Sequence, residues 1–209
     1  MRWRMAVSAL AATTLAASLL AQSTQDRLAA SVKAAAEQFQ GTRTDLQNTI
    51  GALNDLGKQT GDLRPAYDRY TDSIEKTRSS AGLAAKFADT MSADSKTYFD
   101  SWKSEIDGIS NSDIKKASAK RMKAVQKQYD DVVKQLKPLP SLFNPMMSDL
   151  DDLKKALGMD LTPGGLKSLS KSVKKTNEAL VEFQEPVVKG IMGLDKLSAD
   201  LTPSAPAAN

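Results

Sequence analysis

Few residues of this sequence belong to the types that commonly do chemistry. There is no His and no Cys, which removes the commonest general base near neutral pH, the commonest transition-metal ligand and any thiol nucleophile. Adjacent carboxylates occur at Asp130-Asp131 and at Asp151-Asp152. Neighbouring residues of a helix do not face each other, so neither pair predicts a catalytic dyad and both are expected on solvated faces. We therefore expect a protein that is not an enzyme and that uses no cofactor or metal.

The remaining candidate for a functional role is an aromatic cluster. The segment KTYFDSWKSEI, residues 96–106, places Tyr98, Phe99 and Trp102 within five positions in a chain that is only 5% aromatic. Exposed aromatic surface often marks a contact site. The spacing of four between Tyr98 and Trp102 is equally typical of a buried helix seam. We expect these aromatic side chains to contribute to the core, and as the alternative they form the chain's candidate interaction site.

The N-terminal segment has the form of a secretory signal. Arg2 and Arg4 precede an uncharged Ala/Leu-rich run that ends at Leu20, and small residues follow at Ala21 and Ser23. We expect residues 1–22 to be a cleaved signal peptide and the protein to be exported to the periplasm, with an uncleaved anchor as the alternative. The chain has no Cys, so there is no lipobox cysteine for lipid attachment.

The remainder of the chain shows one hydrophobic period. Apolar residues recur at alternating spacings of four and three in four blocks, covering residues 28–56, 63–109, 122–157 and 166–201. A strand would alternate every two residues, whereas this period is typical of long helices packed in coiled coils and bundles. We predict an all-α fold over residues 24–201: an elongated antiparallel four-helix bundle or coiled coil with a protruding central hairpin. Residues 202–209 are expected to form a disordered tail.

Short turns separate the blocks and set which helices are neighbours. In these turns we expect a helix to end at Gly108 and three helices to begin at the N-caps Asp62, Ser112 and Thr162. The expected pairing of the central hairpin places Asp107 opposite Lys116 and Asp100 opposite Lys123. Nucleic acid or anionic lipid would be the functional interpretation of the basic run that begins the third block. We instead expect that run to be matched by its acidic neighbour, and so predict no nucleic-acid partner.

The same pairing gives two further expectations. At the level of Trp102 the first and fourth blocks are ending, so the aromatic cluster is expected where the bundle thins from four helices to two. Residues that break helices collect at another level, beside small residues of the second block. They form either a waist with a groove or hinge, or ordinary helix curvature with Phe39 and Phe183 filling the space. This set comprises Gly41, Gly82, Pro138, Pro140, Pro145 and Pro186, with Ala81, Ala84, Ala85 and Ala88.

Several segments resemble a known family in their order and spacing. They are AEQF, DLRPAYDRY, FDSWKSEI, SDIKKASAKRMKAVQKQY and LKPLPSLFNPMMSDLDDLKKAL. Together they are similar to the bacterial exported domain-of-unknown-function family 2959, over roughly residues 26 to 195. The resemblance implies an envelope coiled coil and supplies no activity. Members often look like lipoproteins, but LLAQS has no Cys, so lipid anchoring is not implied. The sequence LKKALG lacks the family's His and Asn, so no role of theirs is carried over.

These observations predict an exported envelope protein that acts as a structural or protein-interaction scaffold without catalysis. Its partner would be an unknown envelope protein or a second copy of the chain. Two alternatives remain open. A bundle could bind a lipid or other apolar ligand at the waist, or the hairpin tip could contact a membrane peripherally.

Overall fold

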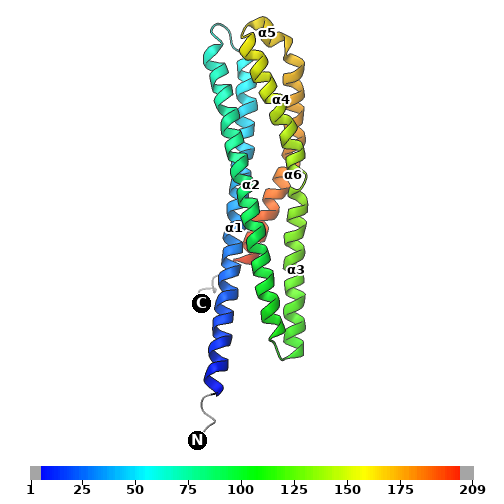
Figure 1. The fold of residues 1–209 in the computed structure, drawn as a ribbon. Coiled ribbons are helices and arrows are strands. Elements are labelled where there is room, and N and C mark those ends of the chain that lie inside the picture. The colour runs from blue at the N-terminus through cyan, green and yellow to red at the C-terminus, as the bar shows by residue number, and fades with distance from the viewer. Residues whose placement is uncertain (1–5, 203–209) are drawn as a thin grey trace, which may run out of the picture.

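The computed structural model describes residues 6–202, with side chains from residue 23 onward, and within them it is all-α (Figure 1). The first two helices are long and uninterrupted: α1 spans Ala6–Leu56 and α2 spans Arg64–Asp107. The third block of the sequence forms two helices, α3 (Ser112–Leu136) and α4 (Leu139–Met159). The fourth forms a short α5 (Pro163–Ser168) and the long α6 (Ser170–Leu201).

Local chemistry explains where the helices start. The Asn111 side chain accepts hydrogen bonds from the backbone N–H groups of Asp113 and Ile114, so Asn111 is the N-cap of α3 in place of the expected Ser112. Thr162 caps α5 as predicted, accepting from Gly165 N at 3.1 Å. The Asp62 carboxylate accepts from Arg64 N at 2.9 Å. The N-cap position of α2 is Leu63, however, so the expectation for Asp62 was one residue early.

Polar contacts show how the long helices lie alongside one another. Between α1 and α2, Arg27 pairs with Asp94, and Thr49 shares a 2.8 Å hydrogen bond with Thr77. The partner number on α2 therefore falls as the number on α1 rises. Between α1 and α6 the partner number also falls as the α1 number rises. The three hydrogen-bonded pairs are Gln25 with the Leu201 carbonyl, Arg43 with Gln184, and Asn54 with Asn177.

The buried core follows the predicted seam positions. Leu28, Leu46, Leu150 and Leu194 are each 0% exposed, and together they draw on α1, α4 and α6. One contiguous cluster of buried residues runs the length of the described part of the bundle. Burial of this apolar surface is what holds the helices together, because isolated helices gain little stability from their own hydrogen bonds.

Some expectations fall at the ends of the chain. Residues 1–5 of the expected signal peptide and residues 203–209 of the expected tail lie outside the described residues. The backbone from Ala6 onward belongs to α1, which continues without interruption through residue 22. Among the described residues, no helix combines enough length and apolar character to cross a membrane.

Candidate functional site

An apolar groove lies between α2 and the α3–α4 side of the bundle, and we call it the waist groove. Its volume is about 600 Å³. It lies at the level where the sequence collects its helix-breaking residues. The lining side chains and backbone belong to Phe39, Thr42, Ala81, Gly82, Ala84, Ala85, Ala88, Asp89, Met91, Ser92, Tyr129, Val133, Leu136, Lys137, Leu139, Pro140, Phe143, Asn144 and Phe183.

Two features of the sequence open this groove. The α2 wall carries Ala81, Gly82 and Ala85, whose side chains are too short to reach the opposite helices. On the other side α3 ends at Leu136 and α4 begins at Leu139, so the helix is interrupted at Lys137 and Pro138. A proline lacks the N–H group that would continue the hydrogen-bond ladder, so the ladder is interrupted here although the backbone at Lys137 and Pro138 keeps helical angles. The groove therefore forms where small residues face a break.

The floor of the groove consists of aromatic side chains. Phe183 of α6 is 3% exposed, and its ring centroid lies 6.0 Å from that of Phe143 in α4. Phe39 of α1 is only partly buried. Phe39 and Phe183 thus line the hollow without filling it, so the expectation of filled space at this level was wrong. Pro145 and Pro186 lie inside helices that continue past them, so only the Lys137–Pro138 step interrupts a helix here.

A few polar residues line the groove: besides the buried Thr42, whose hydroxyl donates to the Gln38 carbonyl, there are four exposed ones. Asp89 and Ser92 come from α2, while Lys137 and Asn144 come from the α3–α4 side. Neither Asp89 nor Lys137 makes an ion pair with any side chain in the described range, residues 23–202. An apolar interior with a few polar groups at its mouth is the usual composition of a small-molecule site.

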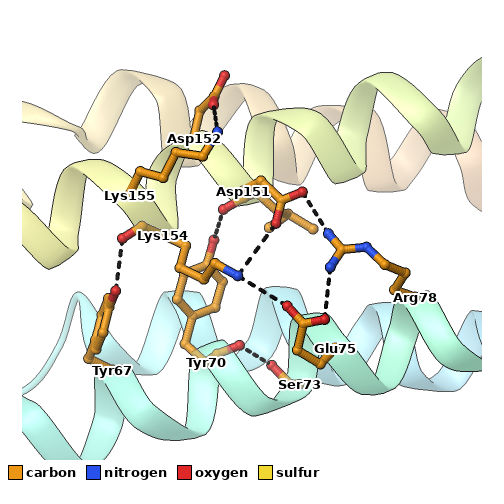
Figure 2. A network of polar contacts seen from close by, with 10 residues as sticks. Tyr67, Tyr70, Ser73, Glu75, Arg78, Asp151, Asp152, Lys154 and Lys155 are labelled. Atoms are coloured by element: carbon orange, nitrogen blue, oxygen red, sulfur yellow. Dashed lines mark hydrogen bonds and ion pairs between the residues drawn. The ribbon is translucent and has the colours of Figure 1, made fainter.

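A polar network holds α2 against α4 at one end of the groove (Figure 2). Arg78 contacts Asp151 at 2.6 Å and Glu75 at 2.8 Å, and Lys154 contacts Glu75 at 3.1 Å. The hydrogen bond from Lys154, with that from Arg78, lowers the pKa of the Glu75 carboxyl. All of these side chains are exposed or partly exposed, so each pair contributes little stability alone. Their number and geometry fix the position of α2 relative to α4.

Two tyrosines complete this end. The Tyr70 hydroxyl donates to the Leu150 carbonyl at 2.7 Å, and the Tyr67 hydroxyl donates to the Lys154 carbonyl at 3.0 Å (Figure 2). Tyr70 is completely buried. That burial raises the pKa of its phenol well above the ordinary value. Both tyrosines fall in the expected block 63–109, but the hydrophobic period gave no sign that their hydroxyl groups reach the α4 backbone.

The aromatic cluster holds α2 against α3 at the other end of the groove. The ring centroid of Tyr98 lies 5.2 Å from that of Phe99 and 5.4 Å from that of Trp102. The indole N–H of Trp102 donates to the Ser118 hydroxyl at 3.2 Å, and the Phe99 ring meets Tyr129 edge-on. Tyr98 is 5% exposed, while Phe99 and Trp102 are partly buried. Burial raises the pKa of Tyr98 to about 12, against a smaller opposing effect of Arg121.

The surroundings of the cluster match the predicted thinning in part. A hollow of about 400 Å³ beside Tyr98 and Trp102 is also lined by Gln25 and by Leu201, the last residue of α6. The fourth helix thus ends at this level as expected. In the full-length chain α1 begins at Ala6 and passes this level, so the first helix would end here only after cleavage of the expected signal peptide, which stays a prediction. Whether the cluster binds a partner stays a prediction.

Three of the four carboxylates in the acidic pairs form ion pairs. Asp151 pairs with Arg78, Asp152 with Lys155 and Asp131 with Lys127. Across the described residues, no three or more His, Cys, Asp or Glu side chains gather into a possible metal site.

The expected charge matching of the central hairpin was wrong. Asp100 pairs with Lys96 of its own helix at 2.7 Å instead of facing Lys123. Asp107 lies 3.9 Å from Lys115 and does not pair with Lys116. An i,i+4 partner on the same helix is always within reach, whereas a partner on a neighbouring helix must also have the right rotation. The basic run of α3 is therefore largely unmatched.

One protein family matches almost the whole chain. Residues 16–197 match the family described as "Protein of unknown function (DUF2959)". The chain belongs to this family. The DUF2959 match contains all of α2 to α5 and most of α1 and α6, and so includes the waist groove and both of its ends. No curated protein and no solved structure matches the chain.

Proposed function

We propose that this DUF2959 protein binds a small apolar or single-chain amphiphilic molecule in the waist groove, without catalysis. The fold that carries the groove is, in this proposal, an elongated antiparallel four-helix bundle with a protruding central hairpin. The observation that carries the proposal is the groove itself: an apolar hollow of about 600 Å³ at the break between α3 and α4. Ligand sites commonly enclose about 300–1,000 Å³ and are lined in this way.

The size of the groove favours a slender occupant over a helix. A helix about 10 Å in diameter that rises 1.5 Å per residue occupies about 120 Å³ per residue. The groove, at about 600 Å³, would thus hold only about five helical residues. A flexible aliphatic chain or a small ring system needs no such width.

The lining favours an apolar body with a polar end. Ala84, Met91 and Leu139 present only apolar atoms and are nearly buried. Asp89 and Lys137 stand at the edge, where a ligand's polar group stays in contact with water. Charged groups inside the groove would lose hydration on binding, and their absence from its interior supports an apolar ligand.

Two alanines of the same helix provide a matched test. Ala85 lines the groove, whereas Ala93 is exposed on α2 outside it. We expect Ala85→Phe to fill the groove and weaken binding of a fluorescent long-chain fatty acid at least tenfold, while Ala93→Phe leaves binding unchanged. Native mass spectrometry of the wild-type protein should also retain a copurified apolar molecule. Equal binding by the wild type and Ala85→Phe, with both proteins folded by circular dichroism, refutes the proposal.

A protein-interaction scaffold is the second candidate, and the aromatic cluster favours it. Trp102 keeps part of its ring accessible beside a hollow at the end of α6, and a partner or a second copy of the chain would cover that ring. We expect Trp102→Ala to weaken self-association or partner capture more than it lowers the melting temperature. A large drop in melting temperature with unchanged association in the folded fraction contradicts this candidate.

We also propose that the protein acts in the periplasm after cleavage of the N-terminal signal segment close to residue 22. Support comes from the charged, apolar and small-residue regions of the N-terminal sequence. The N-terminal mass of the exported protein tests this directly: a start at Gln22 or Thr24 is expected, and retention of Met1 contradicts cleavage.

A further inference from the structure

Helix α3 carries a straight row of lysines on its exposed side, and we call it the lysine stripe. Successive members lie four, three, four and seven residues apart, which keeps them on one face of a helix with 3.6 residues per turn. The first and last lysines are 18 positions apart, or about 27 Å at 1.5 Å per residue. Because α3 contains no Gly or Pro, it has no kink that would turn part of the row away. The lysine stripe comprises Lys116, Lys120, Lys123, Lys127 and Lys134.

The stripe is exposed and mostly unpaired. All five side chains are exposed, and only Lys127 forms an ion pair, with Asp131 at 2.7 Å. The other four make no ion pair with any side chain of residues 23–202. The acidic residues expected to neutralise them are engaged elsewhere, as with Asp100 and Lys96. The same face carries Asp130 and Asp131, of which Asp131 pairs with Lys127, so the repulsion among the four unpaired lysines is compensated only in part.

The charge of the whole chain is concentrated on this helix. Helix α3 contains seven basic and three acidic residues, a net charge of 7 − 3 = +4. The full chain has 29 basic and 25 acidic residues, also +4, so the rest of the chain has 22 of each and sums to zero. Without residues 1–22, which carry Arg2 and Arg4, the rest has 20 basic and 22 acidic residues, a net charge of 20 − 22 = −2. A positive face on a rod that is otherwise slightly negative orients the molecule toward a negatively charged surface.

We propose that the lysine stripe docks the bundle lengthwise on an anionic lipid bilayer. Lysine rows beside a membrane gain attraction from anionic headgroups, which is worth about a fivefold change in binding per lysine. A flat surface suits the stripe because all five ammonium groups contact it at once. The ammonium group is a compact point charge that needs no specific partner geometry, as expected for a layer of mobile headgroups.

The composition of the stripe favours lipid over nucleic acid. Nucleic-acid interfaces combine phosphate contacts with Arg forks on base edges or with aromatic side chains that stack on bases. The stripe contains only Lys. The aromatic residues Tyr98 and Tyr129 are nearly buried, and the Phe99 and Trp102 rings pack against the bundle.

Docking would also place the waist groove beside the bilayer. Val133 and Lys137 line the groove. Lys134 of the stripe lies next to Val133 and one turn before Lys137. A bundle lying on its stripe therefore brings one edge of the groove toward the lipid surface. The docking proposal does not rest on the groove being a ligand site, and the two are tested separately.

Vesicle co-sedimentation of the folded protein without residues 1–22 tests the stripe. Vesicles of phosphatidylglycerol with phosphatidylcholine are compared with vesicles of phosphatidylcholine alone, at low salt and at about 0.1 M salt, where the screening length is about 10 Å. The stripe variant carries Lys→Gln at the four unpaired positions, 116, 120, 123 and 134. The matched control carries Lys→Gln at four exposed lysines without an ion pair elsewhere, namely Lys33, Lys167, Lys171 and Lys196.

We expect the wild type to bind the anionic vesicles and to be released by salt. The stripe variant should bind more than a hundredfold more weakly, since each lysine contributes about fivefold, and the control should stay within about threefold of the wild type. Three results overturn the proposal: no binding by the folded wild type, equal loss in both variants, or tighter wild-type binding to a DNA duplex than to the vesicles. The groove variant Ala85→Phe should bind vesicles normally, so failure of the ligand proposal leaves this outcome unaffected.

Discussion

Two glycines at the waist should respond to the same substitution in opposite ways. Gly82 in α2 lines the groove, whereas Gly190 in α6 faces α3. Both lie inside long helices, so Ala in place of Gly lowers the conformational freedom of the unfolded chain to the same extent at each position. The two positions differ in the space that an added Cβ atom would enter, because Gly82 faces the open groove and Gly190 faces a packed side chain.

At Gly82 an added Cβ meets no atom within 4 Å. Gly82→Ala should therefore raise the free energy of unfolding by the full helix-propensity difference between Ala and Gly, about 1 kcal/mol. For a chain of this size, that gain raises the melting temperature by about 2–4 °C.

At Gly190 an added Cβ lies 2.5 Å from Cδ2 of Leu136, a side chain that is 9% exposed. Overpacking of this kind costs about 1–3 kcal/mol. The propensity gain of about 1 kcal/mol offsets part of it. Gly190→Ala should therefore lower the free energy of unfolding by about 0–2 kcal/mol.

Urea denaturation followed by circular dichroism measures both free energies, and the melting temperatures provide an independent check. The difference between the variants, about 1–3 kcal/mol, is the informative quantity because it cancels the shared propensity gain. A destabilising effect of Gly82→Ala would show that this position is packed and that the groove is closed in solution. Equal stabilisation by both substitutions would refute the close approach of α6 to α3.

Further predictions concern single hydrogen bonds, a buried phenol and a helix cap. Tyr70→Phe leaves the Leu150 carbonyl without its side-chain donor and should lower the free energy of unfolding by about 1–1.5 kcal/mol at neutral pH, as measured in urea. The folded pKa of Tyr98, about 12, lies above its unfolded value near 10, so its stabilisation is complete below pH 10 and is lost as the pH rises towards 12. Tyr98→Phe should therefore flatten the decline of stability between pH 10 and 12, and an unchanged decline would contradict the burial of this phenol. Asn111→Ala removes both acceptor contacts of the α3 N-cap and should cost about 1 kcal/mol, whereas Ser112→Ala should cost less; the reverse order would contradict the observed cap.

Much of the fold could be predicted because the hydrophobic period is long and the turns are short. The expected block 63–109 corresponds to α2, Arg64–Asp107, and Thr162 caps the following helix as expected. The family resemblance, which rests on segments spread along the chain, is confirmed by the match over residues 16–197. Periodicity is informative here because every helix buries a continuous seam.

The groove shows where sequence reasoning stopped. The sequence indicated the level, since Gly82, Pro138 and Pro140 fall beside the alanines of α2. It could not decide whether Phe39 and Phe183 fill the space there, because that depends on side-chain directions within a three-dimensional void. Nor could it distinguish Pro138, where a helix ends, from Pro145, which α4 accommodates internally.

The charge pattern failed for a related reason. A helical hairpin register predicts which residues lie at the same level, as for Asp107 and the first turn of α3. It does not predict their rotation about the helix axis, so the Asp100 carboxylate was assigned to α3 although Lys96 lay within reach on its own helix. The polar network around Arg78 and Asp151 was missed because it joins residues 73 positions apart.

The step at Lys137 and Pro138 makes one part of the bundle less stiff than the rest. Helices α1, α2 and α6 pass this level without interruption, whereas α3 and α4 meet at a two-residue step. A helix bends most easily where its hydrogen-bond ladder is interrupted, so we expect bending of the bundle to be easiest at this step. Since the groove lies beside the step, its width should change when the bundle bends.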